Sequence, residues 1–176
     1  MKRLLFCPAL GLLAASALIS HAAIISVTTT NNISPPAGQT SLVQALRSVN
    51  DGDTIRFQIP GDGPHYLVTP TDGYPRIQKS NVTIDGYSQP GATPNSNPLR
   101  APNNAKLKIV LDSRTGGRTV MNYSTGRTGY GDSENAILGV FNAANVTIRG
   151  LCFLGLHTSN SDQDPSIYCV AYSRDH

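Results

Sequence analysis

Three carboxylates beside glycine-rich turns are the first residues in this sequence whose types and spacing suggest chemistry. Asp51, Asp53 and Asp62 surround the start of an alternating apolar segment, and carboxylate oxygens of this kind can bind calcium. Calcium needs about six to eight oxygen ligands, and no complete calcium-loop spacing is present. The sequence therefore predicts no cofactor, and calcium stays open as an alternative.

Two charged pairs have compositions that polysaccharide-cleaving enzymes use. Asp85 and Arg149 occupy the same position in two copies of a short repeat, where a lyase would need a base beside a neutralising cation. Alternation places both side chains outward, so a solvated surface pair is the ordinary interpretation. Asp162 and Asp164 could be the acid and base of a hydrolase, but they fall in a turn, where aspartate is common. We assign no catalytic, cofactor-binding or metal-binding residue.

The remaining reactive residue types do not form a recognisable constellation. His65 and His157 lack neighbours at metal-ligand spacing, and solvent-facing or loop positions are expected for both. Cys152 and Cys169 could form a disulfide, or could be two small buried side chains in neighbouring strands. Asn-x-Ser/Thr sequons, which are acceptors for glycosylation, occur at Asn32, Asn81, Asn122 and Asn145. Tyrosines in loops could stack on sugars or pack their loops down: Tyr74, Tyr87, Tyr123 and Tyr130.

A repeated hexapeptide, Asn-Val-Thr-Ile-x-Gly, organises the elements that must position these residues. It occupies residues 81–86 and recurs at 145–150. The asparagine suits a turn and can stack on its counterpart, Val and Ile point inward, and the glycine lies where a Cβ would obstruct the bend. The copies are 64 residues apart, which suggests three stacked coils of roughly 21 residues, with a second marker at Asn103 and Asn104. Two larger coils are the alternative.

One helix and a series of short strands are expected around this repeat. The helix covers residues 41–49, with Thr40 or Ser41 as its N-cap and Gly52 closing its C-terminus. Loops are expected to leave the core at residues 87–104 and 116–131. Strands are expected at residues 24–30, 53–59, 65–69, 81–86, 106–112, 136–141, 145–156 and 167–172.

The N-terminal segment, residues 1–22, has the pattern of a secretory signal peptide. Two basic residues precede an apolar run that Pro8 and Gly11 interrupt, and small residues predict cleavage after Ala22 or Ala23. A retained N-terminal anchor is the alternative. The expected mature chain has an N-terminal strand and loop at 23–40 and the main body at 41–176. Its net charge falls from +3 to about +1, and it has no Lys/Arg cluster, which argues against nucleic acid as a partner.

Four segments together resemble a known family. They are residues 41–46, 51–57, 82–91 and 146–151, and they are similar to the amino-terminal region of secreted bacterial right-handed parallel β-helix proteins of the pectin-lyase-like superfamily. The resemblance implies an all-β solenoid, capped at its N-terminus by the short amphipathic helix and incomplete at its C-terminus. Family members include polysaccharide lyases, glycoside hydrolases and surface adhesion proteins, so the fold alone does not select an activity.

The expected function is that of an exported scaffold, adhesion or carbohydrate-binding protein without catalysis in this chain. The alternative is the N-terminal part of a polysaccharide lyase or glycoside hydrolase whose active coils lie beyond residue 176. Export predicts a secreted or cell-surface location, and a polysaccharide or cell-surface glycan is the expected partner. An uncovered sheet edge also predicts edge-to-edge self-association.

Overall fold

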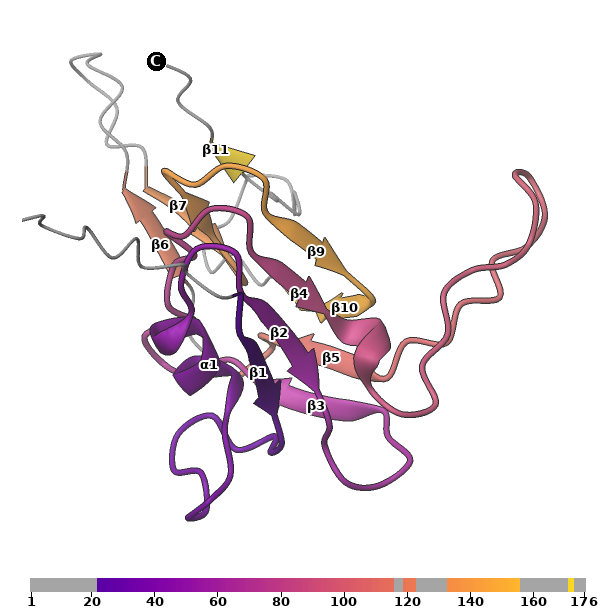
Figure 1. Cartoon of the computed structure of the whole chain (residues 1–176), viewed down its shortest axis with the longest axis horizontal. Helices are drawn as coiled ribbons and strands as arrows, with labels where there is room; N and C mark the ends of the chain where they lie inside the picture. Colours follow the sequence, from indigo (N-terminus) through magenta and orange to yellow (C-terminus); the bar gives the residue numbers. More distant parts are fainter. Residues whose placement is uncertain (1–21, 116–118, 123–132, 156–170, 173–176) are drawn as a thin grey trace, which may run out of the picture.

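The computed structural model describes residues 22–115, 119–122, 133–155 and 171–172 (Figure 1). One α-helix and short strands follow one another in these segments. Their order is β1 (Ile24–Val27), α1 (Leu42–Ser48), β2 (Thr54–Phe57), β3 (His65–Val68), β4 (Thr83–Asp85), the 3-10 turn η1 (Gly86–Ser88), β5 (Ile109–Asp112), β6 (Thr119–Asn122), β7 (Ser133–Ala136), β8 (Val140–Phe141), β9 (Thr147–Arg149), β10 (Leu151–Leu154) and β11 (Ala171–Tyr172).

The largest sheet has four parallel strands in the order β1-β2-β4-β9. Its register aligns Ile55 with Ile84 and Ile84 with Ile148, so one isoleucine from each of three strands lies in a row. Ile55 and Ile84 are fully buried, whereas Ile148, on the edge strand β9, is half-buried. The alternation read from the sequence therefore points the expected residues inward.

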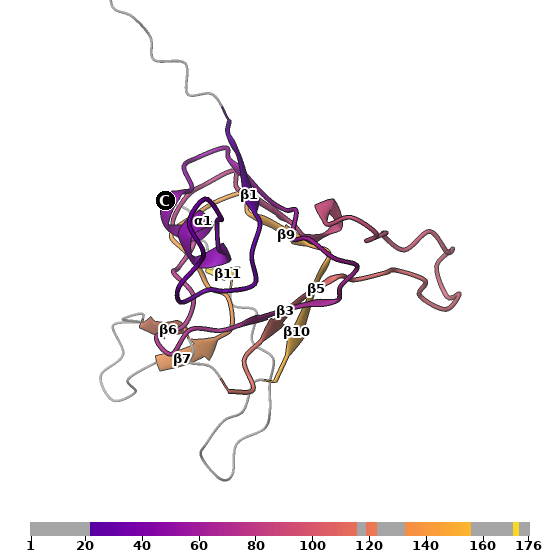
Figure 2. The ribbon, with the colours of Figure 1, turned by 90° about the horizontal axis from the view of Figure 1, so that it is seen from below.

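A second parallel sheet, ordered β10-β5-β3, lies across a shared interior from the first (Figure 2). Strands β8 and β11 form a further parallel pair, and β6 and β7 pair antiparallel. Apolar side chains from both large sheets and from α1 meet in one cluster, because each sheet has an apolar face that must be buried. Its fully buried members include Leu42, Phe57, Leu67, Ile77 and Leu111.

Helix α1 confirms the helix expected at residues 41–49. Ser41 is its N-cap and forms a capping box with Gln44, in which each side chain binds the backbone N–H of the other. The predicted role of Gly52 is wrong. The helix ends at Ser48, the extended backbone of its C-cap Val49 leaves the helical path, and Gly52 lies in the following turn with φ +87°. Its N–H donates to the carbonyl of Ser80 instead.

The predicted fold class, an all-β right-handed parallel β-helix, is wrong. The described residues have mixed α/β character, with short parallel sheets of four and three strands and one α-helix. The predicted coil of about 21 residues fails for a physical reason. Strand β4 pairs directly with β9, so the two copies of the hexapeptide are adjacent, and no intermediate copy is paired between them although their asparagines are 64 positions apart.

The loop expected at residues 87–104 is confirmed. It leaves the sheets after η1 and projects from the molecule at the right of Figure 1. An antiparallel bridge between Thr93 and Lys106 closes its base, and Leu99 near its tip is 94% exposed. Asn104 does not mark a coil, because its side chain binds Ser96 and Asn97 within this loop.

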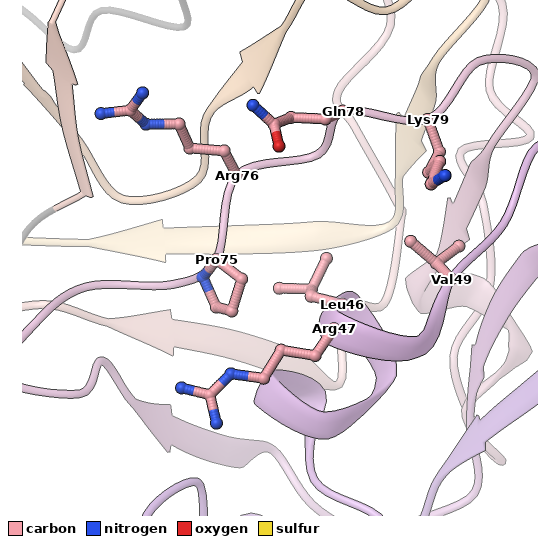
Figure 3. A pocket seen from close by; sticks show the side chains of 7 residues that line it. All are labelled: Leu46, Arg47, Val49, Pro75, Arg76, Gln78 and Lys79. Carbon is pink, nitrogen blue, oxygen red and sulfur yellow. The ribbon is translucent and has the colours of Figure 1, made fainter.

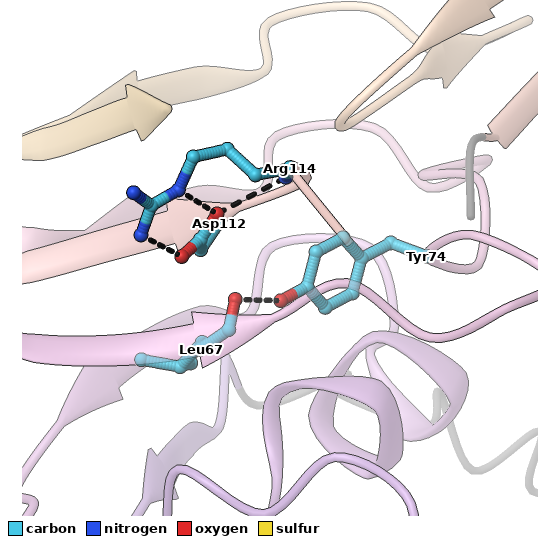
Figure 4. A network of polar contacts seen from close by, with 4 residues as sticks. All are labelled: Leu67, Tyr74, Asp112 and Arg114. Carbon is cyan, nitrogen blue, oxygen red and sulfur yellow. Dashed lines mark hydrogen bonds and ion pairs between the residues drawn. The ribbon is translucent and has the colours of Figure 1, made fainter. Parts of the chain in front are cut away.

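A buried tyrosine links the N-terminal loop to β3, and Figure 4 shows its bond to Leu67 of β3. The Tyr74 hydroxyl accepts from the Asn32 side-chain amide at 2.9 Å and donates to the Leu67 carbonyl at 3.2 Å. Burial of the phenol raises the pKa of Tyr74 well above its usual range. Nearby, Arg114 makes two side-chain hydrogen bonds to Asp112, and these bonds lower the pKa of that carboxyl.

Alkaline solution is therefore expected to destabilise the protein from about pH 10 upward. In that range the Tyr74 phenol loses its proton in the unfolded chain and keeps it in the folded protein, so the unfolded state gains stability. The free energy of unfolding should fall by about 1.4 kcal/mol per pH unit from this group. Denaturant unfolding at several pH values gives the free energy of unfolding as a function of pH. Above about pH 10 this free energy should fall less steeply with pH in Tyr74→Phe than in the unmodified protein. Equal slopes would show that Tyr74 does not cause the dependence.

Candidate functional site

A basic pocket lies between the C-terminal end of α1 and the segment that leads to β4 (Figure 3). Its volume is about 280 Å³. Three cationic, three apolar and one amide side chain line it: Arg47, Arg76, Lys79, Leu46, Val49, Pro75 and Gln78.

Local structure explains why these residues line one pocket. Leu46 and Val49 turn toward the core from the last turn of α1, which leaves the neighbouring Arg47 exposed. Ile77 is fully buried and bridges to Val140, so its chain neighbours Arg76 and Gln78 point away from the core. The two elements thus place an apolar floor beneath exposed polar groups.

The pocket has a positive electrostatic character. None of its lining residues is acidic, and within the described residues Arg47 and Lys79 form no ion pair. The Arg76 guanidinium lies 5.6 Å from the centre of the Phe141 ring, which orients it by a cation–π contact. Guanidinium and ammonium groups around apolar side chains can bind an anion that also has an apolar face.

Sequence reasoning missed this pocket because no run of basic residues marks it. Arg47 lies about thirty positions before Arg76 and Lys79, and only the fold brings the two segments together. The available signal was weak: two cations occur within the four residues 76–79, next to a buried isoleucine.

The charged pair proposed from the repeat is brought together by the structure. Arg149 donates to Asp85 at 2.8 Å across β9 and β4, as the surface-pair interpretation expects. This hydrogen bond raises the pKa of Arg149 above its usual range. Asp85 also accepts from the N–H of Tyr87 as the cap of η1. Because the carboxylate is bonded to its own cation, this geometry favours a structural role over proton abstraction.

The three carboxylates considered for calcium do not converge. Asp53 is 2% exposed and accepts backbone N–H groups from Ala23 and Asn50. Asp51 accepts from the N–H of Ser80, and the backbone carbonyl of Asp62 accepts from Lys108. No three His, Cys, Asp or Glu side chains within the described segments are grouped as metal ligands.

The asparagines and tyrosines divide between structural and surface positions. Asn145 donates to Asn81 at 3.1 Å, which confirms the predicted stacking, and both residues have a left-handed backbone. Asn32 is buried, with its amide bonded to Val68 and Tyr74, so a glycan has no access to it. Of the two alternatives for Tyr74, the structure supports packing of its loop over stacking on a sugar, because the residue is 2% exposed. Tyr87 is half-buried.

Two further predictions concern single residues. His65 is half-buried on β3 and lies 3.1 Å from the Gln89 side chain, so it is not simply solvent-facing. Cys152 is half-buried on β10 with a free thiol. The other predicted positions lie outside the described residues or have side chains that are not described: the signal peptide up to residue 21, Asn122, Tyr123, Tyr130, His157, Asp162, Asp164 and Cys169.

Comparisons with family models, curated proteins and solved structures gave no match. The resemblance to secreted β-helix proteins therefore remains a prediction from sequence motifs. Within the described residues, no helix has the length and apolar character needed to cross a membrane.

Proposed function

We propose that this protein is an exported extracellular or cell-surface scaffold that binds an acidic glycan in the pocket of Arg47, Arg76 and Lys79. The N-terminal apolar segment supports export, because its basic start, short length and small residues fit a secretory leader. The pocket supports the ligand class. No catalytic step is part of the proposal.

The single observation that carries the ligand class is three cations around an apolar floor with no carboxylate among the lining residues. A uronic acid has a carboxylate that Arg47 or Arg76 can bind through paired N–H donors. Its C–H face can pack on Pro75, and Gln78 can donate to or accept from hydroxyl groups. A neutral sugar could contact Pro75 and Gln78 but has no carboxylate for the cations to bind.

Binding to oligogalacturonate, used as an acidic probe, should exceed binding to neutral oligosaccharides of the same length. The affinity should fall as salt rises, because the exposed charges are screened. The variant carrying Arg47→Glu and Lys79→Glu should bind the acidic probe at least about tenfold more weakly, a loss of about 1.4 kcal/mol. Isothermal titration calorimetry at two salt concentrations measures both effects.

Lys106→Glu together with Arg100→Glu is the matched control, because it makes the same charge change in the projecting loop, outside the pocket. Equal weakening by both double variants would indicate binding by net charge and would contradict a pocket. Equal binding of acidic and neutral probes would contradict the ligand class. Appearance of unsaturated products that absorb ultraviolet light would contradict a non-catalytic scaffold.

A further inference from the structure

Asp53 is a buried carboxylate at the junction of three elements, just before β2. Its side chain accepts the Ala23 N–H at 2.7 Å through Oδ1 and the Asn50 N–H at 2.8 Å through Oδ2. Its own backbone carbonyl accepts from Thr83 of β4. Asp53 is 2% exposed, so its carboxylate is buried at this junction.

No cationic side chain compensates this buried charge in the segments that the structure describes. Burying a carboxylate is costly unless it is hydrogen-bonded and paired with a positive charge. The hydrogen bonds are present, but both donors are neutral amides. A positive charge at the position of either amide nitrogen would complete the pairing.

Ala23 is the residue whose amide can become such a charge. It is one of the two positions at which the sequence predicts a new N-terminus. Its carbonyl accepts from the Thr54 N–H at 2.8 Å, so its backbone is fixed in line with β1. A free amino group at this nitrogen would already lie at the distance of a charge-assisted hydrogen bond, about 2.7–2.9 Å.

We propose that the Ala22–Ala23 peptide bond is the processing site and that the released Ala23 ammonium pairs with the buried Asp53 carboxylate. In this hydrolysis, water adds to the Ala22 carbonyl carbon and the C–N bond breaks. Ala22 leaves with a carboxylate, and Ala23 keeps the nitrogen as an ammonium after proton uptake. The inference rests on the proposed export, and it names the place where the leader is removed.

The same geometry distinguishes the two cleavage positions that the sequence leaves open. Cleavage after Ala23 would remove both the N–H that binds Asp53 and the carbonyl that binds Thr54. A buried carboxylate oxygen and a backbone donor would then lose their partners. Cleavage after Ala22 keeps both bonds and adds the charge.

Mass spectrometry of the full chain expressed in a bacterium tests the processing site. The exported protein should begin at Ala23. An exported protein that begins at Ile24 would overturn the inference and leave the proposed export intact. Retention of the whole chain with Met1 inside the cell would contradict the proposed export.

The charge pairing is tested separately, with a purified chain that begins at Ala23. At about pH 6.5 an α-amino group is protonated, so N-terminal acetylation removes the charge and keeps the N–H donor. Acetylation should lower the melting temperature by about 3–6 °C. The shift should vanish in Asp53→Asn and persist in the matched control Asp51→Asn, whose carboxylate binds Ser80 instead. An acetylation shift of the same size in both variants would overturn the pairing.

A second measurement covers the case in which Asp53→Asn does not fold. The Ala23 amine of the unmodified mature chain should react with an acylating reagent at least about tenfold more slowly when folded than in urea, because the ion pair holds it protonated. Equal rates in the two conditions would overturn the proposal.

Discussion

Replacing Gly86 by alanine is expected to lower the free energy of unfolding by about 3 kcal/mol. An added Cβ would lie 2.5 Å from the Gly150 carbonyl carbon and 2.7 Å from Leu151 Cδ2, and it would meet the Gly150 oxygen more closely still. Two of these atoms are backbone, which the pairing of β4 with β9 holds in place. The clash can be relieved only by separating the two copies of the hexapeptide.

Urea unfolding of Gly86→Ala beside Gly38→Ala measures this effect against a matched control. Gly38 has a left-handed φ of +77° but nothing within 4 Å of an added Cβ, so its substitution carries conformational strain alone, about 1–2 kcal/mol. Gly86 has no such φ, so its cost comes from the contact. A Gly86→Ala protein that unfolds at the midpoint of the unmodified protein would contradict the close packing of the two turns.

Truncation of Ile84 should have a comparable effect, with a loss of about 3–4 kcal/mol in Ile84→Ala. Ile84 is fully buried and lies between Ile55 and Ile148 in the row across the four-stranded sheet. Removing three carbons there leaves a cavity that neighbours on both sides cannot fill without breaking the register.

Ile148→Ala is the matched comparison, because Ile148 occupies the same position in the second hexapeptide. It lies on the edge strand β9 and is half-buried, so its loss should be about 1–2 kcal/mol. Denaturant unfolding of both variants, with the same dependence of the free energy on denaturant concentration, gives the two losses of unfolding free energy. Equal losses at both positions would indicate that Ile148 is covered as completely as Ile84.

Local features of this fold could be read from the sequence because each depends on neighbouring residues. Ser41 and Gln44 specify the helix start, and Ile84 lies in the core because residues of a strand alternate. The stacked asparagines and the Asp85–Arg149 pair followed from the repeat itself. In each case the chemistry and the contact belong to one short pattern.

Features that depend on the path between segments could not be read in this way. The 64 positions from Asn81 to Asn145 can be divided into coils in several ways. The sequence does not show that this segment contains a projecting loop and strands of other sheets. Tyr74 lies in a loop as expected, but it is buried there, and its hydroxyl is bonded to Asn32, 42 positions earlier in the chain. The basic pocket was missed for the same reason, because only the position of α1 brings Arg47 to the same pocket as Arg76.

The loop between η1 and β5 can change in length without changing the register of the strands on either side. The bridge from Thr93 to Lys106 closes the loop at its base, and Leu99 near the tip is 94% exposed. Lengthening a loop adds entropic cost only slowly, so residues added at the tip leave strand alignment unchanged. Evolution can therefore vary this segment, or an engineer can graft a foreign peptide onto it, while the paired hexapeptides hold the rest of the molecule in place.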